Sequence, residues 1–330
     1  MILDDVCKSR RIGKIDVQTP LLVPSFSSVV CDIPSEMHAK LKDHITDASL
    51  FSAYDLRRGK KAKVTQEEIW GSNVVFVDSG NYEVQHVKDT LNQIHQTKTT
   101  KARAWTRQMH SKLIDSLRPP PLAKTVLINY DEKKALEKQI SSAHSFFARY
   151  GKFASCFLSR PCNKSSQVDV ESLVDNVALL EEFDILGLTE KELGDSLVNR
   201  CTNILKLRKA LNSHGSNTPI HVFGCLDPLG IVSYFLCGAD IFDGTLWLKY
   251  GFHKNTAVYL NNYAMLMGKW ASTDIGVLIM SWVLNLNDLR KLMLSMRRFA
   301  QDHNPDVFGF DQTIMEQITD LTKTAASGVG

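Results

Sequence analysis

Short runs of β-branched and aliphatic residues recur along the whole chain, and segments long enough for a helix separate them. Alternating strands and helices predict a parallel sheet, because a helix usually forms the crossover between two parallel strands. There are eight such runs, the number that a closed (β/α)8 barrel needs. They are residues 21–26, 49–54, 73–78, 125–130, 153–158, 183–188, 220–225 and 239–243.

Polar residues and glycines come directly after most of these runs. They occur in DSG (78–80), NYDE (129–132), LSRP (158–161), LGLTE (186–190), FGCLD (223–227) and FDG (242–244). In a (β/α)8 barrel the carboxyl ends of all strands meet on one face, and the loops on that face carry the catalytic residues. The pattern therefore favours a (β/α)8 TIM barrel, an α/β fold, over an open doubly wound sheet.

The length and composition fit one domain of this kind. The chain has 330 residues, of which 44% are hydrophobic and 23% charged, and a barrel commonly reaches this length as a single folding unit. We expect one domain over residues 1–324 and a disordered tail over 325–330. Apolar spacing predicts helices over 168–180 and 286–301, the latter closing the barrel, and Asp227-Pro228 predicts a helix start.

Positive charge is distributed unevenly, although the net charge is only +3. One basic cluster contains Lys98, Lys101, Arg103 and Arg107, with Trp105 among them. Phosphate neutralisation combined with aromatic stacking is typical of polynucleotide binding, so we expect this cluster to contact nucleic acid. The alternative for any one cluster is an ordinary solvated surface.

The cysteines argue against a disulfide framework and against a zinc ribbon. There are seven of them, and no two form a Cys-x-x-Cys pair, so reduced thiols and a cytoplasmic location are expected. The first residues place acids before bases and contain no long apolar stretch. No segment approaches the roughly 20 apolar residues of a membrane span. The sequence therefore predicts neither a signal peptide nor a membrane-bound protein.

Three acids stand at or just after the ends of predicted strands. Asp78 ends the third run, Asp131 follows the fourth and Asp243 ends the eighth. Each alone could cap a helix or form a turn, but in a barrel all three would converge on one face. One carboxylate as nucleophile and another as proton carrier is the usual solution for displacement at the anomeric carbon of a sugar. The histidines are scattered without HxH or HExxH spacing, so no metal site is expected.

Two of these acids lie in the segments VDSGNYEV (77–84) and HVFGCLDPLGIVSYFLCGADIFDG (221–244). Both segments resemble the tRNA-guanine transglycosylase (queuine and archaeosine tRNA-ribosyltransferase) superfamily. The first is similar to its DSGGFQ or DSGGYQ motif, and the second is similar to its glycine-containing strand, Pro-started helix and D-x-F-D strand. GKIDVQTPLLVPSFS (13–27) resembles the opening segment, and LNDLRKLMLSMRRF (286–299) resembles the C-terminal helix. The resemblance extends from residue 13 to about residue 300 and implies exchange of guanine in a polynucleotide.

The resemblance implies roles for individual residues. Asp243 matches the nucleophile that attacks C1′ of a nucleotide and forms a glycosyl-enzyme ester, and Asp78 matches the acid that handles protons. Asp131 matches the acid that binds the guanine-like edge, Tyr82 the aromatic that stacks on the base. The positions expected to approach the base through their backbones or to line its pocket are Ser79, Gly80, Gly187, Leu188 and Gly224, with Gly187 and Leu188 in a loop over the base.

The substrates that the resemblance implies are a polynucleotide and a 7-deazaguanine base of the preQ0 or preQ1 type. No cofactor is expected, because departure of one base and arrival of the other are the same step in reverse. A stacked target base would have to be turned out into the pocket. Helper proteins and a homo-oligomer are both compatible with the resemblance.

The chain departs from the tRNA enzymes in three places. Their structural zinc is bound by a Cys-x-Cys-x-x-Cys group and a His after the eighth strand, whereas the last cysteine here is Cys237. The usual Pro-Thr-Arg run is replaced by GTLWLKYG, in which Trp247 and Lys249 are expected to contact the polynucleotide. Asn81 and Glu83 replace the second Gly and the Gln of DSGG-[FY]-Q.

These departures favour a different acceptor for the same reaction. The relatives that fit are the DNA-guanine transglycosylases of 7-deazaguanine DNA-modification systems, so DNA is the expected acceptor and tRNA the alternative. A non-catalytic partner subunit is a second alternative, against which the retained acids argue. The third is an unrelated barrel that acts on a sugar or phosphate, which a phosphate-binding glycine loop after the seventh or eighth strand would favour.

Overall fold

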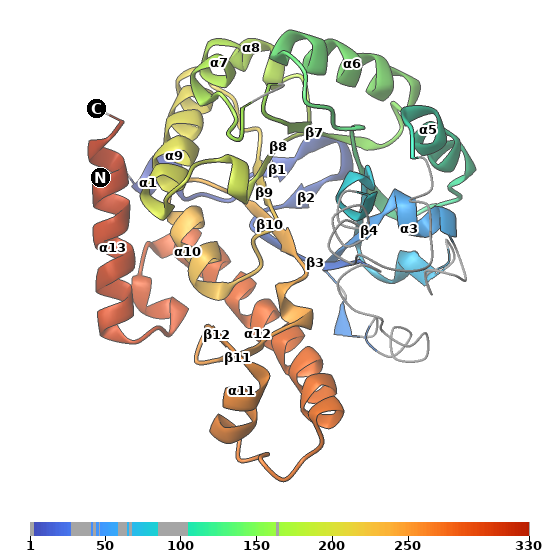
Figure 1. The fold of residues 1–330 in the computed structure, drawn as a ribbon. Coiled ribbons are helices and arrows are strands. Elements are labelled where there is room, and N and C mark those ends of the chain that lie inside the picture. The colour runs from blue at the N-terminus through green and yellow to red at the C-terminus, as the bar shows by residue number, and fades with distance from the viewer. Residues whose placement is uncertain are drawn as a thin grey trace.

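The computed structural model describes residues 3–27, 41, 44–45, 47–58, 65, 68–84, 105–162 and 165–329. Eight parallel strands form a closed barrel surrounded by helices, a (β/α)8 TIM barrel (Figure 1). Strand β10 pairs with β9 and with β3, which closes the barrel. In order around the barrel the strands are β3 (Leu21–Phe26), β4 (Ala48–Ser52), β5 (Val74–Asp78), β6 (Lys124–Ile128), β7 (Ala154–Ser159), β8 (Ile185–Thr189), β9 (Ile220–Phe223) and β10 (Ile241–Gly244).

All eight predicted runs coincide with barrel strands, with boundaries that differ by at most two residues. Side chains in β3, β4, β7, β9 and β10 are buried at every position. Strands of a parallel barrel are covered on both faces, by the barrel interior and by the helices. The continuous apolar runs in the sequence are a direct consequence of this double burial.

Helices follow the strands and cover the outside of the barrel (Figure 1). The predicted start at Asp227-Pro228 is confirmed, because the Asp227 carboxylate accepts a hydrogen bond from the Gly230 N–H at 2.8 Å. The helix predicted over 168–180 is broken at Asn176 into two shorter helices. The helices of the ring are α3 (Ala53–Arg58), α5 (Arg107–Ser116), α6 (Leu136–Arg149), α7 (Val170–Asp175), α8 (Val177–Leu180), α9 (Leu197–Ser213), α10 (Pro228–Leu236) and α12 (Asp274–Asp302).

Helix α12 is longer than the sequence predicted. The apolar run 275–284 and the predicted helix 286–301 join into one helix of 29 residues. Its central part packs on β3 and fastens the segment after β10, because the Trp282 indole donates to the Leu248 carbonyl at 3.0 Å and the Asn285 amide donates to the Trp247 carbonyl at 2.8 Å. The predicted barrel-closing role of residues 286–301 is confirmed.

Smaller elements lie outside the ring. The tail predicted over 325–330 is instead helical up to Ser327, and Ala325 is fully buried, because the last helix packs against α9. None of the described helices is both long enough and apolar enough to cross a membrane. The additional elements are α1 (Leu3–Val6), β1 (Arg11–Ile12), η1 (Gly13–Ile15), β2 (Val17–Gln18), η4 (Glu68–Gly71), η5 (Glu190–Glu192), η6 (Leu246–Leu248), β11 (Gly251–His253), β12 (Thr256–Val258), α11 (Leu260–Leu266), η7 (Pro305–Phe308) and α13 (Gln312–Ser327).

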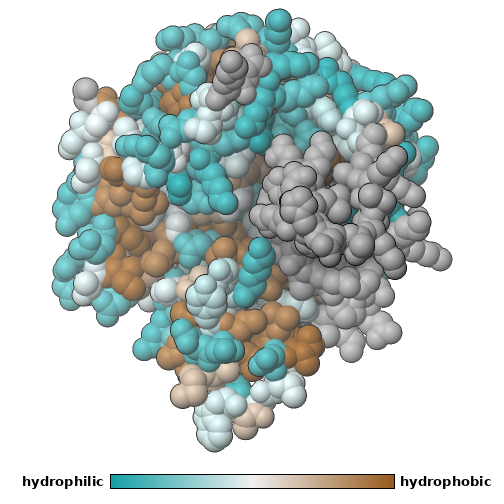
Figure 2. All heavy atoms as spheres, in the orientation of Figure 1, coloured by the Kyte–Doolittle hydropathy of each residue, from teal (hydrophilic) through white to brown (hydrophobic). Residues whose placement is uncertain are grey.

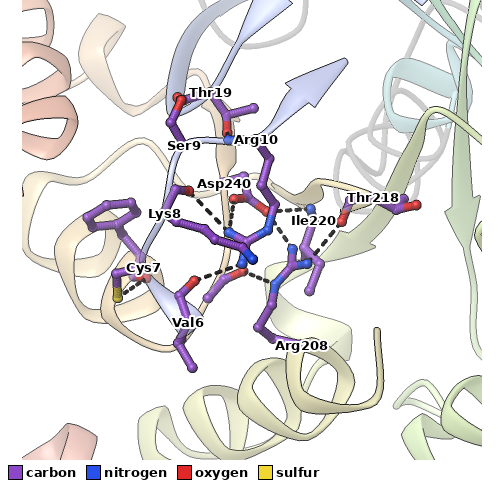
Figure 3. A network of polar contacts seen from close by, with 12 residues as sticks. Val6, Cys7, Lys8, Ser9, Arg10, Thr19, Arg208, Thr218, Ile220 and Asp240 are labelled. Carbon is purple, nitrogen blue, oxygen red and sulfur yellow. Dashed lines mark hydrogen bonds and ion pairs between the residues drawn. The ribbon is translucent and has the colours of Figure 1, made fainter. Parts of the chain in front are cut away.

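A buried ionic network closes the barrel at the amino end of β10 (Figure 3). Asp240 accepts from the guanidinium of Arg10 at 2.7 Å and from that of Arg208 at 2.6 Å, and it also accepts from the Ile220 N–H at 2.8 Å. Burial lowers the pKa of Arg208 to about 10, against the opposing effect of the Asp240 carboxylate. Gly238 (φ +100°) is required beside it, since a Cβ there would lie 2.5 Å from the Arg208 Cγ. The network joins the N-terminal segment, α9 and the last strand.

Candidate active site

The three predicted site acids lie at the carboxyl end of the barrel. Asp78 ends β5, Asp243 is the third residue of β10 and Asp131 follows β6. The charges of Asp131 and Asp243 both act on Asp78, which places the three carboxylates near one another. Burial is the largest cause that raises the pKa of Asp78, and with these two neighbours it brings that pKa to about 7. A carboxyl group with this pKa can give and take a proton at neutral pH.

Asp243 is 6% exposed and is held by three hydrogen-bond donors. The Ser25 hydroxyl donates to Oδ2 at 2.7 Å. The His221 Nε2 lies 3.1 Å from Oδ1, and the Gly224 N–H donates to the same oxygen at 3.3 Å. The donors come from β3, from β9 and from the loop after β9, so the closure of the barrel itself builds this arrangement. Three donors stabilise the carboxylate and fix its direction.

The surroundings of His221 fix the direction of its hydrogen bond to Asp243. The imidazole is fully buried, and its Nδ1 has no hydrogen-bond partner among the described residues. An unprotonated Nε2 would set its lone pair against the carboxylate oxygen of Asp243, so Nε2 carries a proton and donates it in this hydrogen bond. The ring stacks on Phe223 at 3.8 Å and meets Phe76 edge to face at 5.4 Å. His221 therefore donates to Asp243 from a fixed position.

Asp131 is surrounded by donors rather than free. Ser79 donates its hydroxyl and Asn81 its amide, at 3.0 Å, to Oδ1 of Asp131. Arg160, which follows β7, donates to Oδ2 at 2.8 Å and also contacts Glu192 at 2.9 Å. The negative charge of Asp131 is thus paired, and further acceptance from a ligand is limited to the lone pairs that remain.

The turn after Asp78 requires glycine at position 80. Its φ is +86°, and a Cβ would lie 2.7 Å from both the backbone nitrogen and the Cβ of Tyr54. The Gly80 N–H donates to Asp78 at 3.2 Å. Trp105 supports this turn, because its indole donates to the Ser79 carbonyl at 2.8 Å. Since Trp105 is only 8% exposed, the expectation that it stacks on nucleic acid is wrong: its ring is part of the core behind the site.

Residues 81–84 are helical, and they expose the Tyr82 side chain while they bury that of Glu83. The Tyr82 ring is 42% exposed at this end of the barrel, as a base-stacking residue requires. Glu83 is buried and accepts from the Ser52 hydroxyl at 2.7 Å. Burial, followed by the charges of Asp55 and Asp78, raises the pKa of Glu83 to about 8. A protonated Glu83 is neutral at pH 7, as the glutamine of the related motif would be.

The raised pKa of Glu83 predicts a pH-dependent cost to stability. The folded protein keeps a proton that the unfolded chain releases, so stability falls as pH rises from about 4.5 to about 8. Glu83→Gln retains the acceptor for Ser52 and removes this cost. We expect it to raise the free energy of unfolding by roughly 2–4 kcal/mol at pH 9 and by little at pH 4.5, measured by urea denaturation. Glu137→Gln, at an exposed position, is the control. An equal gain at both pH values would refute the prediction.

Gly187 and Leu188 do not form a loop over the site. Both lie within β8, and Leu188 is fully buried. The Phe223 ring packs over Gly187, where a Cβ would lie 2.6 Å from its Cε2. Gly224 differs, because a Cβ there would meet nothing within 4 Å. The open space beside Asp243 is therefore at Gly224, and the predicted pocket-lining role of Gly187 and Leu188 is corrected to strand packing.

The residues expected to bind nucleic acid divide into three groups. Trp247 is fully buried, and its indole donates to the Ser25 carbonyl at 3.2 Å, so it supports the site from below and its predicted surface role is wrong. Lys249 is exposed. Arg107 is also exposed but pairs with Glu132 at 2.5 Å. The remaining three, Lys98, Lys101 and Arg103, lie outside the described residues.

Sequence reasoning missed Ser25, His221 and Arg160. Arg160 had a usable signal, because it follows a strand directly, as the acids do. Ser25 and His221 lie inside apolar runs, where a single polar residue is equally consistent with an ordinary core position. Only the closed barrel, in which β10 lies between β9 and β3, brings both to Asp243.

Two alternative chemistries fit this geometry less well. A phosphate-binding loop after β9 would need backbone N–H groups free of carboxylates, but the Gly224 N–H already donates to Asp243. Within the part of the chain that the structure describes, no group of three or more His, Cys, Asp or Glu side chains is arranged to hold a metal ion.

The chain matches none of the protein-family models and none of the curated proteins with which it was compared.

Proposed function

We propose that this chain is a base-exchange glycosyltransferase that replaces guanine in a polynucleotide with a 7-deazaguanine base. The observation that carries the proposal is the pair formed by Asp243 and Asp78. One carboxylate is fixed by three donors, and a second carboxyl near it has a pKa of about 7. A fixed nucleophile beside a proton carrier is what displacement at an anomeric carbon requires.

The reaction divides into two balanced steps. Asp243 attacks C1′ of the target nucleotide, the C1′–N9 bond breaks, and the departing base takes the electron pair together with a proton from Asp78. The incoming base then gives its N9 proton to Asp78 and attacks C1′, and the ester bond to Asp243 breaks with release of the carboxylate. The donors from Ser25, His221 and Gly224 stabilise this leaving carboxylate. Asp78 must be protonated in the first step and ionised in the second, for which a pKa of about 7 is suitable.

The base would occupy the open space at Gly224, with Tyr82 stacked on one of its faces. The half-exposed Tyr82 ring offers a stacking surface. The network of Asp131, Arg160 and Glu192 presents both acceptors and donors at the same end of the barrel, as the polar edge of a guanine-like base needs. The retained acids argue against a non-catalytic partner subunit, because such a subunit does not need a fixed nucleophile.

DNA is the acceptor that we favour, and tRNA is the alternative. The test is incubation of the protein with radiolabelled guanine and either double-stranded DNA, single-stranded DNA or bulk tRNA. We expect label to enter DNA and not tRNA. Label in tRNA alone would reassign the acceptor, and absence of label from all three, with a preQ0-type base giving the same result, would overturn the proposed reaction.

A further inference from the structure

A segment next to the site extends outward from the barrel. It comprises residues 249–276, which form β11, β12, α11 and the first residues of α12, and we call it the projection (Figure 1). The projection begins at Lys249, shortly after Asp243 in the chain. It therefore starts at the carboxyl end of β10, where the candidate nucleophile lies.

The outer part of the projection exposes large apolar and aromatic side chains. Residues 265–276 are exposed without interruption. Trp270 is 72% and Tyr259 71% exposed, and Met265, Leu266 and Ile275 are each more than half exposed. Figure 2 shows hydrophobic side chains over the part of α12 that adjoins α11. A contiguous exposed surface of this kind marks a contact with another molecule.

The charge of the projection indicates which kind of molecule. Lys249, Lys254 and Lys269 are exposed, and Asp274 is the single acid between residues 249 and 276. A segment that exposes both lysines and aromatic rings matches a single-stranded nucleic acid, in which phosphates meet the lysines and unpaired bases stack on the rings.

The base of the projection is packed firmly on the barrel. The Tyr263 ring is buried against Gly251, where a Cβ would lie 2.2 Å from the ring. The Asn285 side chain of α12 accepts from the Phe252 N–H at 2.7 Å and donates to the Tyr250 carbonyl at 2.7 Å. The exposed side chains are thus presented from a fixed support, as a binding surface requires.

We propose that the projection binds unpaired DNA next to the base that is exchanged, with Trp270 and Tyr259 stacking on bases and the three lysines contacting phosphates. The inference rests on the proposed function, for which it names the surface that holds the strand once the target base leaves the duplex. The alternative occupants are a single-stranded RNA, a second copy of the chain and an unrelated protein.

The test uses Trp270 as its own reporter. Trp105, Trp247 and Trp282 are each 8% exposed or less and Trp70 is half-buried, whereas Trp270 is 72% exposed. Quenching that is present in the wild type and lost in Trp270→Ala therefore reports stacking on Trp270. We titrate the full chain with oligothymidylate, which contains no guanine and cannot undergo exchange. We expect quenching in the wild type, and about tenfold weaker binding by fluorescence anisotropy for Trp270→Ala. Trp270→Phe should restore most of the affinity, and Lys269→Gln should lower the salt slope by about 1.

Controls separate this inference from its rivals. Leu122→Ala removes a side chain that is 92% exposed elsewhere and should leave binding unchanged. Equal affinity of Trp270→Ala and wild type overturns the inference. So does tighter binding of oligouridylate with the same quenching, or a dimer in sedimentation that Trp270→Ala dissociates while DNA binding stays the same. If guanine exchange fails but Trp270-dependent binding is present, only the proposed function is overturned. If exchange occurs but binding does not depend on Trp270, only the inference about the projection is overturned.

Discussion

Substitution of Asp243 by asparagine is expected to abolish the covalent protein–DNA adduct and to slow base exchange by about 10³-fold or more. The asparagine amide has nearly the shape of the carboxylate and can still accept from Ser25. It carries no negative charge, however, and cannot form the ester with C1′. The loss should therefore appear in the chemical step and not in the fold.

The measurement is adduct formation on a denaturing gel, with an end-labelled duplex incubated without an incoming base. Peptide mass mapping of the adduct should locate the attached sugar on Asp243. Asp227→Asn is the matched control, because Asp227 lies after β9 near the same end of the barrel but caps helix α10, a role that asparagine also fills. An adduct of undiminished yield in Asp243→Asn would assign the nucleophile to another residue, and Asp78 would be the next candidate.

The barrel and its three acids could be predicted because both depend on the simplest property of the fold. Parallel strands buried on both faces leave continuous apolar runs, and the carboxyl ends of all such strands meet on one face. Residues that end these runs, such as Asp78 and Asp243, are therefore brought together whatever the details of packing. The same argument should have included Arg160, which follows β7 in the same way.

Packing decided what could not be predicted. Trp105 and Trp247 each stand near basic residues in the sequence, and that pattern is the same for an exposed stacking ring and for a buried ring whose indole supports a turn. In the structure both indoles donate to backbone carbonyls, those of Ser79 and Ser25. Trp270, in contrast, is 72% exposed and directly follows Lys269 in the chain.

His221 shows the same limit within a strand. Its neighbours in the sequence are apolar, and nothing in the run predicts which atom its imidazole faces. The pairing of β10 with β9 aligns Ile241 with His221. Asp243 lies two residues after Ile241 and therefore faces the same side of the sheet, where the His221 Nε2 reaches its carboxylate at 3.1 Å. The carboxylate partner is thus determined by strand register and not by local sequence.

The aspartates at the two ends of β10 have different roles. Asp243 at the carboxyl end is positioned for chemistry, whereas Asp240 at the amino end joins Arg10 and Arg208 in the buried network of Figure 3. Because both acids belong to one short segment, barrel closure and the placement of the nucleophile depend on the same strand. A substitution at either end should therefore separate stability from activity.

We expect Asp240→Asn to lower the free energy of unfolding by about 3–5 kcal/mol. The substitution leaves two guanidinium groups buried beside a neutral amide, and their side chains are at most 1% exposed. Urea denaturation followed by circular dichroism gives the change, from midpoints compared at equal slope. Asp16→Asn is the control, since Asp16 forms an exposed ion pair with Arg11 at 2.8 Å and should lose less than about 1 kcal/mol.

The same variant tests how far the network acts on the site. Asp240 lies at the opposite end of β10 from Asp243, and no hydrogen bond links the two in the described part of the chain. Exchange activity per folded molecule, measured below the unfolding transition, should therefore remain close to wild type. If Asp240→Asn lowers the free energy of unfolding by less than about 1 kcal/mol, solvent or a backbone shift compensates the charges of the two arginines. A large loss of activity in fully folded Asp240→Asn would instead show that the network sets the position of β10 and, through it, the direction of the Asp243 carboxylate.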